Sequence, residues 1–209
     1  MKKLVLIGGG GHCKACIDVI ESEKKYEIIG ILEKDNLTSD ILGYPVIGTD
    51  DLIDQLVQKG YEFLVTVGQI KSPNLRIKLA DRVRACGGKL ANVIASTAYI
   101  SAYSKIEEGT IIMHNVFVNA GVEIGSNCII NTGSILEHDV KVGSNCHISV
   151  GAILNGEVEV GDNSFVGSNT VCYQGIKIME NSLIGAGSIV HKTLRKSGVY
   201  LGFPLKKIS

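Results

Sequence analysis

Apolar residues recur at every sixth position through the second half of the chain. The series begins at Ile94 and holds isoleucine, leucine or valine at each step to Val190, with Cys172 as its one exception. An α-helix repeats its apolar face about every 3.6 residues and a strand about every two, so neither element alone gives this period. A hexapeptide repeat is typical of a parallel β-helix. The pattern therefore predicts a β-helix over residues 91–209.

A longer repeat is superimposed on the first. The letters GSNC stand at 125–128 and again at 143–146, and GDNS follows at 161–164, so the interval is 18 residues. Three hexads then make one coil, and residues 18 apart are expected to stack about 4.8 Å from one another. Glycine and asparagine recur where corners are expected, and both tolerate left-handed backbone conformations.

The first 90 residues show a different pattern of apolar and polar positions. Apolar runs at 3–8, 26–33 and 61–68 read as buried strands and alternate with helical patterns at 12–22, 49–60 and 72–88. Thr49 and Ser72 are expected to cap the second and third helices, with Pro73 in the first helical position and Gly60 ending the second helix. Alternating strands and helices predict a small α/β domain with a parallel sheet over residues 1–90.

A glycine-rich turn, Gly8 to His12, follows the first predicted strand and opens the first helix. Backbone N–H groups and the helix dipole bind phosphate at such a place. The dinucleotide fingerprint fails, however, because Cys13 stands where its third glycine belongs. Phosphate or nucleotide binding is favoured here, and a merely tight turn is the alternative.

The composition limits the classes of partner that the protein is expected to bind. Lysine and arginine total 21 and aspartate and glutamate total 21, so no net field attracts nucleic acid or an anionic membrane. The apolar run Leu4 to Ile7 is too short for a signal peptide or a membrane span. We expect a cytoplasmic protein whose partners are small molecules and copies of itself.

The six cysteines lie in apolar-periodic segments and suggest reduced, packed thiols rather than a disulfide framework. Cys13 and Cys16 stand at the start of a helix, where a thiolate would be stabilised, so a redox or metal role is the alternative. No second cysteine pair lies near them in the sequence. Packed thiols are the favoured interpretation.

His138 occupies a corner of its hexad, with Glu137 and Asp139 on either side. An imidazole held by a carboxylate is suited to general base catalysis near neutral pH. Spacing does not decide which carboxylate orients the ring. One coil later stands Gly156, which leaves room for a substrate and presents a backbone N–H to a developing oxyanion. A solvated corner is the alternative.

Three histidines of the predicted β-helix invite comparison with zinc sites. His114, His138 and His147 fall in different columns of the 18-residue coil. Ligands must converge within about 2 Å of one ion, so this set would need a subunit interface to complete it. We expect no metal.

The combination of the GGGGH turn, the hexad array, the EHD corner and the terminal GFPLKK resembles a family of bacterial sugar acetyltransferases. Its members couple a Rossmann-like domain to a left-handed β-helix, and they include the bacillosamine-pathway N-acetyltransferase and the sialic acid O-acetyltransferase. The resemblance covers essentially the whole chain. It implies a homotrimer, with acetyl-CoA between neighbouring β-helices and a nucleotide sugar on the N-terminal domain.

The resemblance also implies roles for individual residues. His138 matches the base, Asp139 the carboxylate that orients it, although the pattern usually has Glu there, and Gly156 a donor to the thioester carbonyl. The residues that match positions near coenzyme A are Asn131, His147, Gly156, Lys206 and Lys207. The positions that match the nucleotide-sugar site are Gly10, Gly11, His12 and Glu33. Members that bind UDP often have paired aspartates after the second strand, where this chain has Glu33 and Lys34.

The favoured function is acetyl-CoA-dependent N-acetylation of a UDP- or dTDP-linked 4-amino-4,6-dideoxyhexose, by direct transfer with His138 as base. O-acetylation of sialic acid or another sugar hydroxyl is the alternative within the same class. A non-enzymatic scaffold and a metal-dependent hexapeptide-repeat protein are alternatives from other classes.

Overall fold

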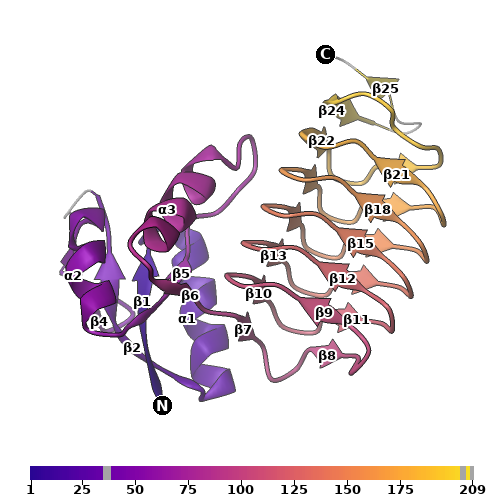
Figure 1. Ribbon diagram of the computed structural model, residues 1–209. Coiled ribbons are helices and arrows are strands. Elements are labelled where there is room, and N and C mark those ends of the chain that lie inside the picture. The colour runs from indigo at the N-terminus through magenta and orange to yellow at the C-terminus, as the bar shows by residue number, and fades with distance from the viewer. Residues whose placement is uncertain (35–38, 203–205, 208–209) are drawn as a thin grey trace.

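The computed structural model describes residues 1–34, 39–202 and the backbone of 206–207 (Figure 1). An α/β domain comes first, and a tall stack of short strands follows it. The last strand of the domain's sheet ends at Leu90, and the first strand of the stack begins at Val93.

The first domain holds one six-stranded sheet in the order β3-β4-β2-β1-β5-β6. All neighbours are parallel except β3 and β4, which form an antiparallel hairpin. Its strands are β1 (Lys2–Ile7), β2 (Tyr26–Leu32), β3 (Asp40–Ile41), β4 (Tyr44–Gly48), β5 (Glu62–Val65) and β6 (Lys89–Leu90). Its helices are α1 (Gly11–Glu23), α2 (Ile53–Gln58) and α3 (Asn74–Ala85).

The predicted α/β pattern is confirmed, with local differences. The sequence did not predict β3, β4 and β6. The second helix begins as a 3-10 turn at Asp50–Leu52, and Thr49 caps that turn by accepting from the N–H of Asp51. The third helix begins at Asn74, so placing Pro73 in the first helical position was wrong by one residue. The hydroxyl of Ser72 still accepts from the N–H of Asn74 at 3.2 Å, although Ser72 lies one residue before the N-cap, Pro73.

The second part is a left-handed parallel β-helix with three faces, in which strands pair with those 18 residues away. We call these three faces the domain face, the apolar face and the charged face, and define each by its strands. The domain face consists of β7 (Val93–Ile94), β10 (Ile111–Ile112), β13 (Ile129–Ile130), β16 (His147–Ile148), β19 (Phe165–Val166), β22 (Ser182–Ile184), β24 (Gly198–Leu201) and β25 (Lys206–Lys207). The apolar face consists of β8 (Tyr99–Ile100), β11 (Phe117–Val118), β14 (Ile135–Leu136), β17 (Ile153–Leu154), β20 (Val171–Cys172) and β23 (Ile189–Val190). The charged face consists of β9 (Lys105–Ile106), β12 (Glu123–Ile124), β15 (Lys141–Val142), β18 (Glu159–Val160) and β21 (Lys177–Ile178).

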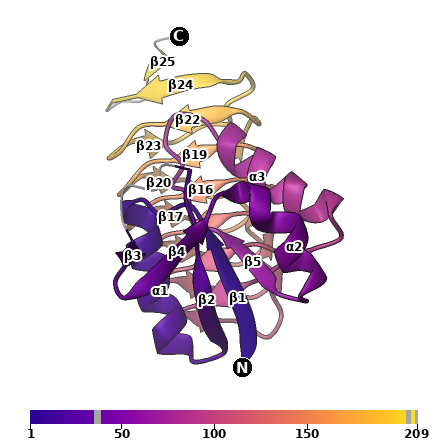
Figure 2. The same cartoon turned by 90° about the vertical axis from the view of Figure 1, so that its left-hand side faces the viewer.

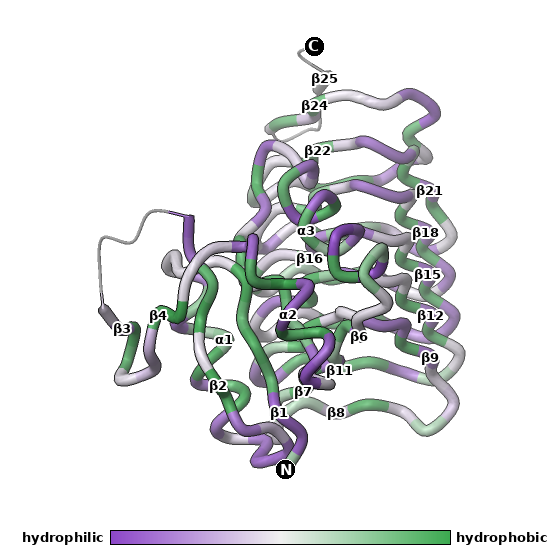
Figure 3. Tube along the Cα trace, turned by 60° about the vertical axis from the view of Figure 1, so that its left-hand side comes forward, coloured by the Kyte–Doolittle hydropathy of each residue, from purple (hydrophilic) through white to green (hydrophobic). Residues whose placement is uncertain are grey.

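The hexad series supplies the core of this β-helix. From Ile112 to Val190 every member of the series is buried, while Ile94, Ile100 and Ile106 are partly buried at the open end. Figure 3 shows hydrophobic segments recurring in coil after coil. The core runs the length of the stack because each coil buries its apolar residues against the coils above and below.

The outward residues distinguish the faces. On the apolar face the outward column is hydrophobic and partly exposed, comprising Tyr99, Phe117, Ile135, Ile153, Val171 and Ile189. On the charged face lysine and glutamate alternate, comprising Lys105, Glu123, Lys141, Glu159 and Lys177. Opposite charges in adjacent strands attract, which favours this register.

Helix α1 lies between the first sheet and the domain face (Figures 1 and 2). Outward residues Val93, Ile111 and Ile129 share one hydrophobic cluster with α1, whereas α2 and α3 pack on the other face of the sheet. The two parts of the chain thus share a continuous apolar contact.

A buried arginine reinforces that contact. The guanidinium of Arg76, on α3, donates to the backbone oxygens of Val65 and Val67 at 2.8 and 2.7 Å and to Oδ1 of Asn127 at 3.0 Å. Asn127 begins a ladder of side-chain hydrogen bonds that climbs one corner of the β-helix, through Asn145, Asn163 and Asn181. Arg76 therefore joins the first domain to the end of this ladder.

Candidate active site

His138 stands at the corner between β14 and β15, where the apolar and charged faces meet. Its Nδ1 lies 3.0 Å from Oδ2 of Asp139. Glu137 is engaged elsewhere, because its Oε2 accepts from Nδ2 of Asn119 at 2.7 Å. The structure thus decides a question that spacing left open: Asp139, and not Glu137, contacts the ring.

This contact determines the chemistry of the imidazole. With Nδ1–H donating to the carboxylate, the neutral ring keeps its lone pair on Nε2. The hydrogen bond to Asp139 raises the pKa of His138. Burial opposes this rise, and the charges of Asp139, Glu157 and Glu137 each add a smaller increase. The ring is exposed and is equipped to accept a proton at Nε2.

Gly156 lies one coil above His138 and against its ring. A Cβ at this glycine would stand 2.5 Å from Nε2, so any side chain would occupy the space in front of the base. Within the part of the chain that the structure describes, the N–H of Gly156 donates to no acceptor. A cavity of about 550 Å³ opens here, lined by Glu137, His138, Asn155, Gly156, Tyr173 and Gln174.

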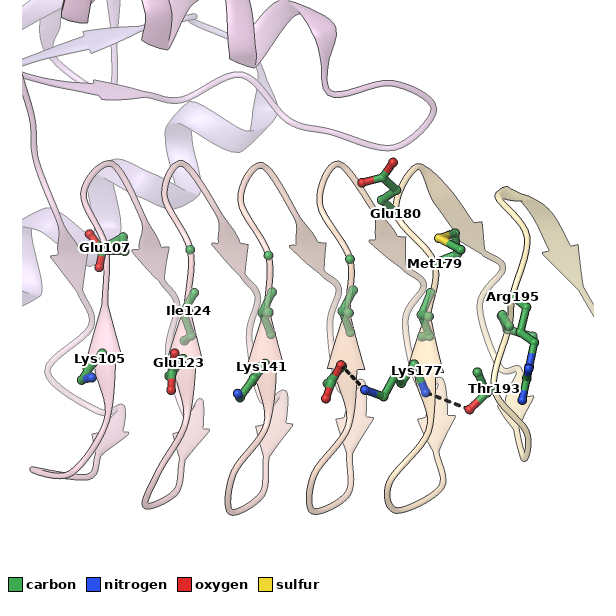
Figure 4. Close-up of a pocket in the computed structure, with 18 residues that line it drawn as sticks. Lys105, Glu107, Glu123, Ile124, Lys141, Lys177, Met179, Glu180, Thr193 and Arg195 are labelled. Atoms are coloured by element: carbon green, nitrogen blue, oxygen red, sulfur yellow. Dashed lines mark hydrogen bonds and ion pairs between the residues drawn. The ribbon is translucent and has the colours of Figure 1, made fainter.

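A larger cavity of about 770 Å³ lies over the charged face (Figure 4). Lys105, Glu123, Lys141, Glu159 and Lys177 follow one another along successive strands there, and Lys177 pairs with Glu159 at 2.9 Å. Its lining contains no histidine or cysteine. Of the two cavities, the smaller one is lined by an imidazole, that of His138.

The glycine turn is open to a ligand. No side chain caps α1 at Gly10, and a Cβ at Gly10 or Gly11 would meet nothing within 4 Å. Glu33 lies beside the turn, and its carboxylate accepts from the N–H groups of Gly9 and of Lys34. The free N–H groups at the start of α1 suit a phosphate, and Glu33 holds the turn against the end of β2.

The two other histidines predicted to contact ligands are held at the junction between the domains. Burial and the charge of Arg76 lower the pKa of His12 to about 3, and burial lowers the pKa of His147 to about 4. Nδ1 of His147 lies 2.6 Å from the backbone oxygen of Gln69, and Nε2 lies 3.1 Å from Nδ2 of Asn131. Both ring nitrogens are thus in use, so the predicted coenzyme A contact of His147 stays a prediction that this arrangement does not favour.

Sequence reasoning missed Gln69 and Arg76. Nε2 of Gln69 donates to the backbone oxygen of Asn145 at 2.9 Å, and Arg76 is fully buried. Neither belongs to a motif. Their position is the only signal in the sequence. Gln69 follows β5 and Arg76 lies within α3, near the carboxyl edge of the sheet.

The structure does not bring the glycine turn and His138 together within one chain. The first domain contacts the domain face and the corners on both sides of it, through Arg76 with Asn127 and Asp18 with His114. His138 stands on the third corner, between the apolar and charged faces and away from the domain face.

The terminal segment is described only in part. The backbone of Lys206 and Lys207 forms β25, antiparallel to β24, while their side chains and residues 203–205 of the GFPLKK motif lie outside the described residues. Their predicted contact with coenzyme A phosphates stays a prediction.

Cys13 and Cys16 are buried, and burial raises the pKa of Cys13 to about 11. Over residues 1–34 and 39–202, the structure contains no group of three or more histidine, cysteine, aspartate or glutamate side chains placed to hold a metal ion. None of the helices in these same ranges has the length and apolar character needed to cross a membrane.

Comparisons with known proteins agree with this architecture. The PglD N-terminal domain model matches residues 3–83, the bacterial transferase hexapeptide model residues 103–138, and the hexapeptide repeat of succinyl-transferase residues 157–192. No curated protein sequence matches the chain. Perosamine N-acetyltransferase from Caulobacter crescentus, solved with CoA and GDP-perosamine, is 31% identical over 100% of this chain and 98% of its own, with a TM-score of 0.93.

The chain belongs to this family of sugar N-acetyltransferases. It is therefore an acyltransferase. The acetyltransferase domain of PglB from Neisseria gonorrhoeae is 28% identical over 100% of both chains, with a TM-score of 0.93, and it has been solved with acetyl coenzyme A. WeeI from Acinetobacter baumannii is 17% identical with a TM-score of 0.84, a likeness of fold alone. The predicted resemblance and fold class are confirmed.

Proposed function

We propose that this protein transfers the acetyl group of acetyl-CoA to the amine of a nucleotide-linked amino sugar, with His138 as general base. The observation that carries the proposal is the imidazole itself, which is held by Asp139 on one side and faces Gly156 and a cavity on the other. Both the Caulobacter and the Neisseria structures contain coenzyme A or its acetyl ester, which supports the choice of acyl donor.

The reaction is a direct transfer. The sugar amine attacks the thioester carbonyl carbon while Nε2 of His138 takes a proton from the nitrogen. The N–H of Gly156 donates to the oxyanion of the tetrahedral intermediate. The carbon–sulfur bond then breaks, and the coenzyme A thiolate leaves with the proton that His138 carries. No cysteine lines the cavity at His138, and the step needs no covalent enzyme intermediate.

The N-terminal domain holds the nucleotide sugar in this proposal. Gly10 and Gly11 present backbone N–H groups to its phosphates at the start of α1, and Glu33 lies at the carboxyl edge of the sheet beside them. UDP and dTDP are the predicted nucleotides. The Caulobacter relative was solved with GDP-perosamine, so GDP joins them as a candidate.

A homotrimer completes the site in this proposal. The glycine turn belongs to the first domain and His138 stands on the corner away from the domain face, so one molecule bridges them only if it spans two copies of the chain. The apolar face supports such packing, because its outward column is hydrophobic throughout and nothing in the described chain covers it. The corner that carries His138 borders this face, which places the base beside the contact between copies.

O-acetylation of a sugar hydroxyl, including that of sialic acid, is the second candidate. A hydroxyl is a weaker nucleophile than an amine, so its attack demands a stronger base. The carboxylate on Nδ1 of His138 strengthens the ring as a base, which keeps this candidate in the test.

The test measures free thiol released from acetyl-CoA by the purified protein with UDP-, dTDP- and GDP-linked 4-amino sugars and with sialic acid in parallel. Release with an amino sugar supports the proposal, and the best nucleotide identifies the carrier. Release with sialic acid alone would replace N-acetylation with O-acetylation. No thiol release with any of these substrates would refute the proposed substrates.

A further inference from the structure

Left-handed backbone conformations recur at every sixth residue from 109 to 187, a range that the structure describes completely. Twelve of these corner positions hold glycine or asparagine, the residues that adopt positive φ most readily. The two others are Asp139, with φ of 61°, and Glu157, with φ of 62°. Both exceptions stand at the same corner of adjacent coils, next to His138.

The two exceptions differ in what their side chains do. Asp139 uses its carboxylate to hold the His138 ring. Glu157 is exposed, and within the described residues its carboxylate takes part in no hydrogen bond or ion pair. Glutamate in the left-handed region is a strained choice at a corner where asparagine would serve, and strained residues of this kind cluster at functional sites.

Glu157 lies close to the base. It follows Gly156, which touches the Nε2 edge of the His138 ring, and its N–H donates to the backbone oxygen of His138 at 2.9 Å. It also stands 18 residues after Asp139, directly above it in the stack. One carboxylate therefore lies at the Nδ1 side of the ring and a second follows the glycine at the Nε2 side.

We propose that Glu157 is a positioning residue for the transfer, whose carboxylate stabilises the imidazolium that His138 becomes when it takes the proton of the amine. The inference rests on the proposed function of His138. The other groups that face the ring are Asp139, already bonded to it, Glu137, bonded to Asn119, and the phenol of Tyr173 in the cavity wall. Of the three carboxylates at this corner, those of Asp139 and Glu137 are already hydrogen-bonded, whereas that of Glu157 has no partner in the described structure. Its charge contributes to the raised pKa of His138.

The first test is the pH profile of kcat/KM for Glu157→Gln, which keeps the size and the backbone conformation but removes the charge. The plateau is expected to fall roughly three- to tenfold, because the charged form of the base is less stable. The acidic limb should move to lower pH, since losing a nearby negative charge lowers the pKa of His138. A wild-type profile, or the same fractional loss at every pH, would overturn the inference.

Glu159→Gln is the matched control. It removes the same charge two residues further along, on the charged face, where Glu159 pairs with Lys177. Its profile should coincide with that of the wild type. An equal displacement in both variants would mean that the overall charge of the β-helix matters, and not the position of Glu157.

A second variant, Glu157→Asn, separates function from folding. Asparagine fills six of the corner positions at positive φ, so the substitution should raise the melting temperature while it lowers kcat/KM. A lower melting temperature would show that Glu157 supports the fold, and the proposal would fail.

An NMR titration of the histidine Cε1–H signals keeps this inference distinct from the proposed function. The His138 signal is assigned as the one that disappears in His138→Ala. The pKa of His138 should be lower in Glu157→Gln than in the wild type, whether or not the substrates are correct. An unchanged pKa in an active enzyme would contradict only the role of Glu157. An inactive wild type would contradict the proposed function.

Discussion

Oδ2 of Asp139 lies 3.0 Å from Nδ1 of His138, and this contact leaves Nε2 as the free nitrogen of the ring. Because Asp139 has a φ of 61°, its carboxylate reaches the preceding side chain from a corner that most residues would avoid. The contact between His138 and Asp139 is therefore a product of corner geometry, because the left-handed turn that closes the coil also carries the carboxylate.

Replacing Asp139 by Asn should reduce kcat by roughly 100-fold, because the amide neither fixes the tautomer nor stabilises the imidazolium. The acidic limb of the pH profile should also move to lower pH, since Asp139 raises the pKa of His138. Glu137→Gln is the comparison, and it should lose far less because Glu137 contacts Asn119 instead of the ring. Equal losses in the two variants would contradict this assignment.

Gly156→Ala should abolish most of the activity without unfolding the protein. The added Cβ would stand 2.5 Å from Nε2 of His138 and displace the ring or the acceptor. The backbone at this column accepts a Cβ, because Ala120 occupies the same position two coils below. We expect a loss in kcat of roughly 100-fold with a melting temperature near that of the wild type. Full activity in a folded variant would remove Gly156 from the site.

Arg76→Met should lower the free energy of unfolding by about 3 kcal/mol, because it leaves buried oxygens of Val65, Val67 and Asn127 without their donor. The control is Arg84→Met, which removes partly exposed ion pairs with Asp81 and Glu108 and should change the stability by less than about 1 kcal/mol. Urea unfolding at one protein concentration measures both. Similar values for the two variants would show that the buried hydrogen bonds of Arg76 stabilise the fold no more than exposed ion pairs do.

The junction histidines should make the protein sensitive to acid. Their pKa values of about 3 for His12 and about 4 for His147 lie below those of an unfolded chain, so the unfolded state binds protons first. Stability should therefore fall as the pH drops from about 6.5 towards 4. His147→Gln, which cannot titrate, should flatten this slope by up to about 1.4 kcal/mol per pH unit. Parallel slopes for variant and wild type would contradict the buried neutral state.

The β-helix was predictable because every coil repeats one physical requirement. Each inward position from Ile112 to Val190 must fill a narrow interior, and each corner needs a residue that tolerates positive φ. The hexad series from Ile94 to Val190 has seventeen members, and that many repetitions make the first rule visible in a single sequence. The short strands β3, β4 and β6 obey no such repeat, and each is held by pairing with a neighbouring strand of the sheet.

The site was predictable only where one corner of the β-helix holds its members. His138, Asp139 and Gly156 share a corner that the 18-residue period defines, so their proximity followed from counting. The choice of Asp139 over Glu137 depended on Asn119, a partner one coil away that spacing does not reveal as a donor. The placement of His147 depended on Gln69, 78 residues away, in a loop of the other domain. Contacts between domains carry no periodic signal.

The most direct measurement compares acetyl transfer by the wild type and by His138→Ala, using acetyl-CoA and the amino sugar nucleotide that the wild type accepts best. The account predicts that kcat falls by about 100-fold or more, with an unchanged melting temperature and oligomeric state, because only the base is lost. A folded His138→Ala protein that keeps the wild-type rate would contradict the central claim.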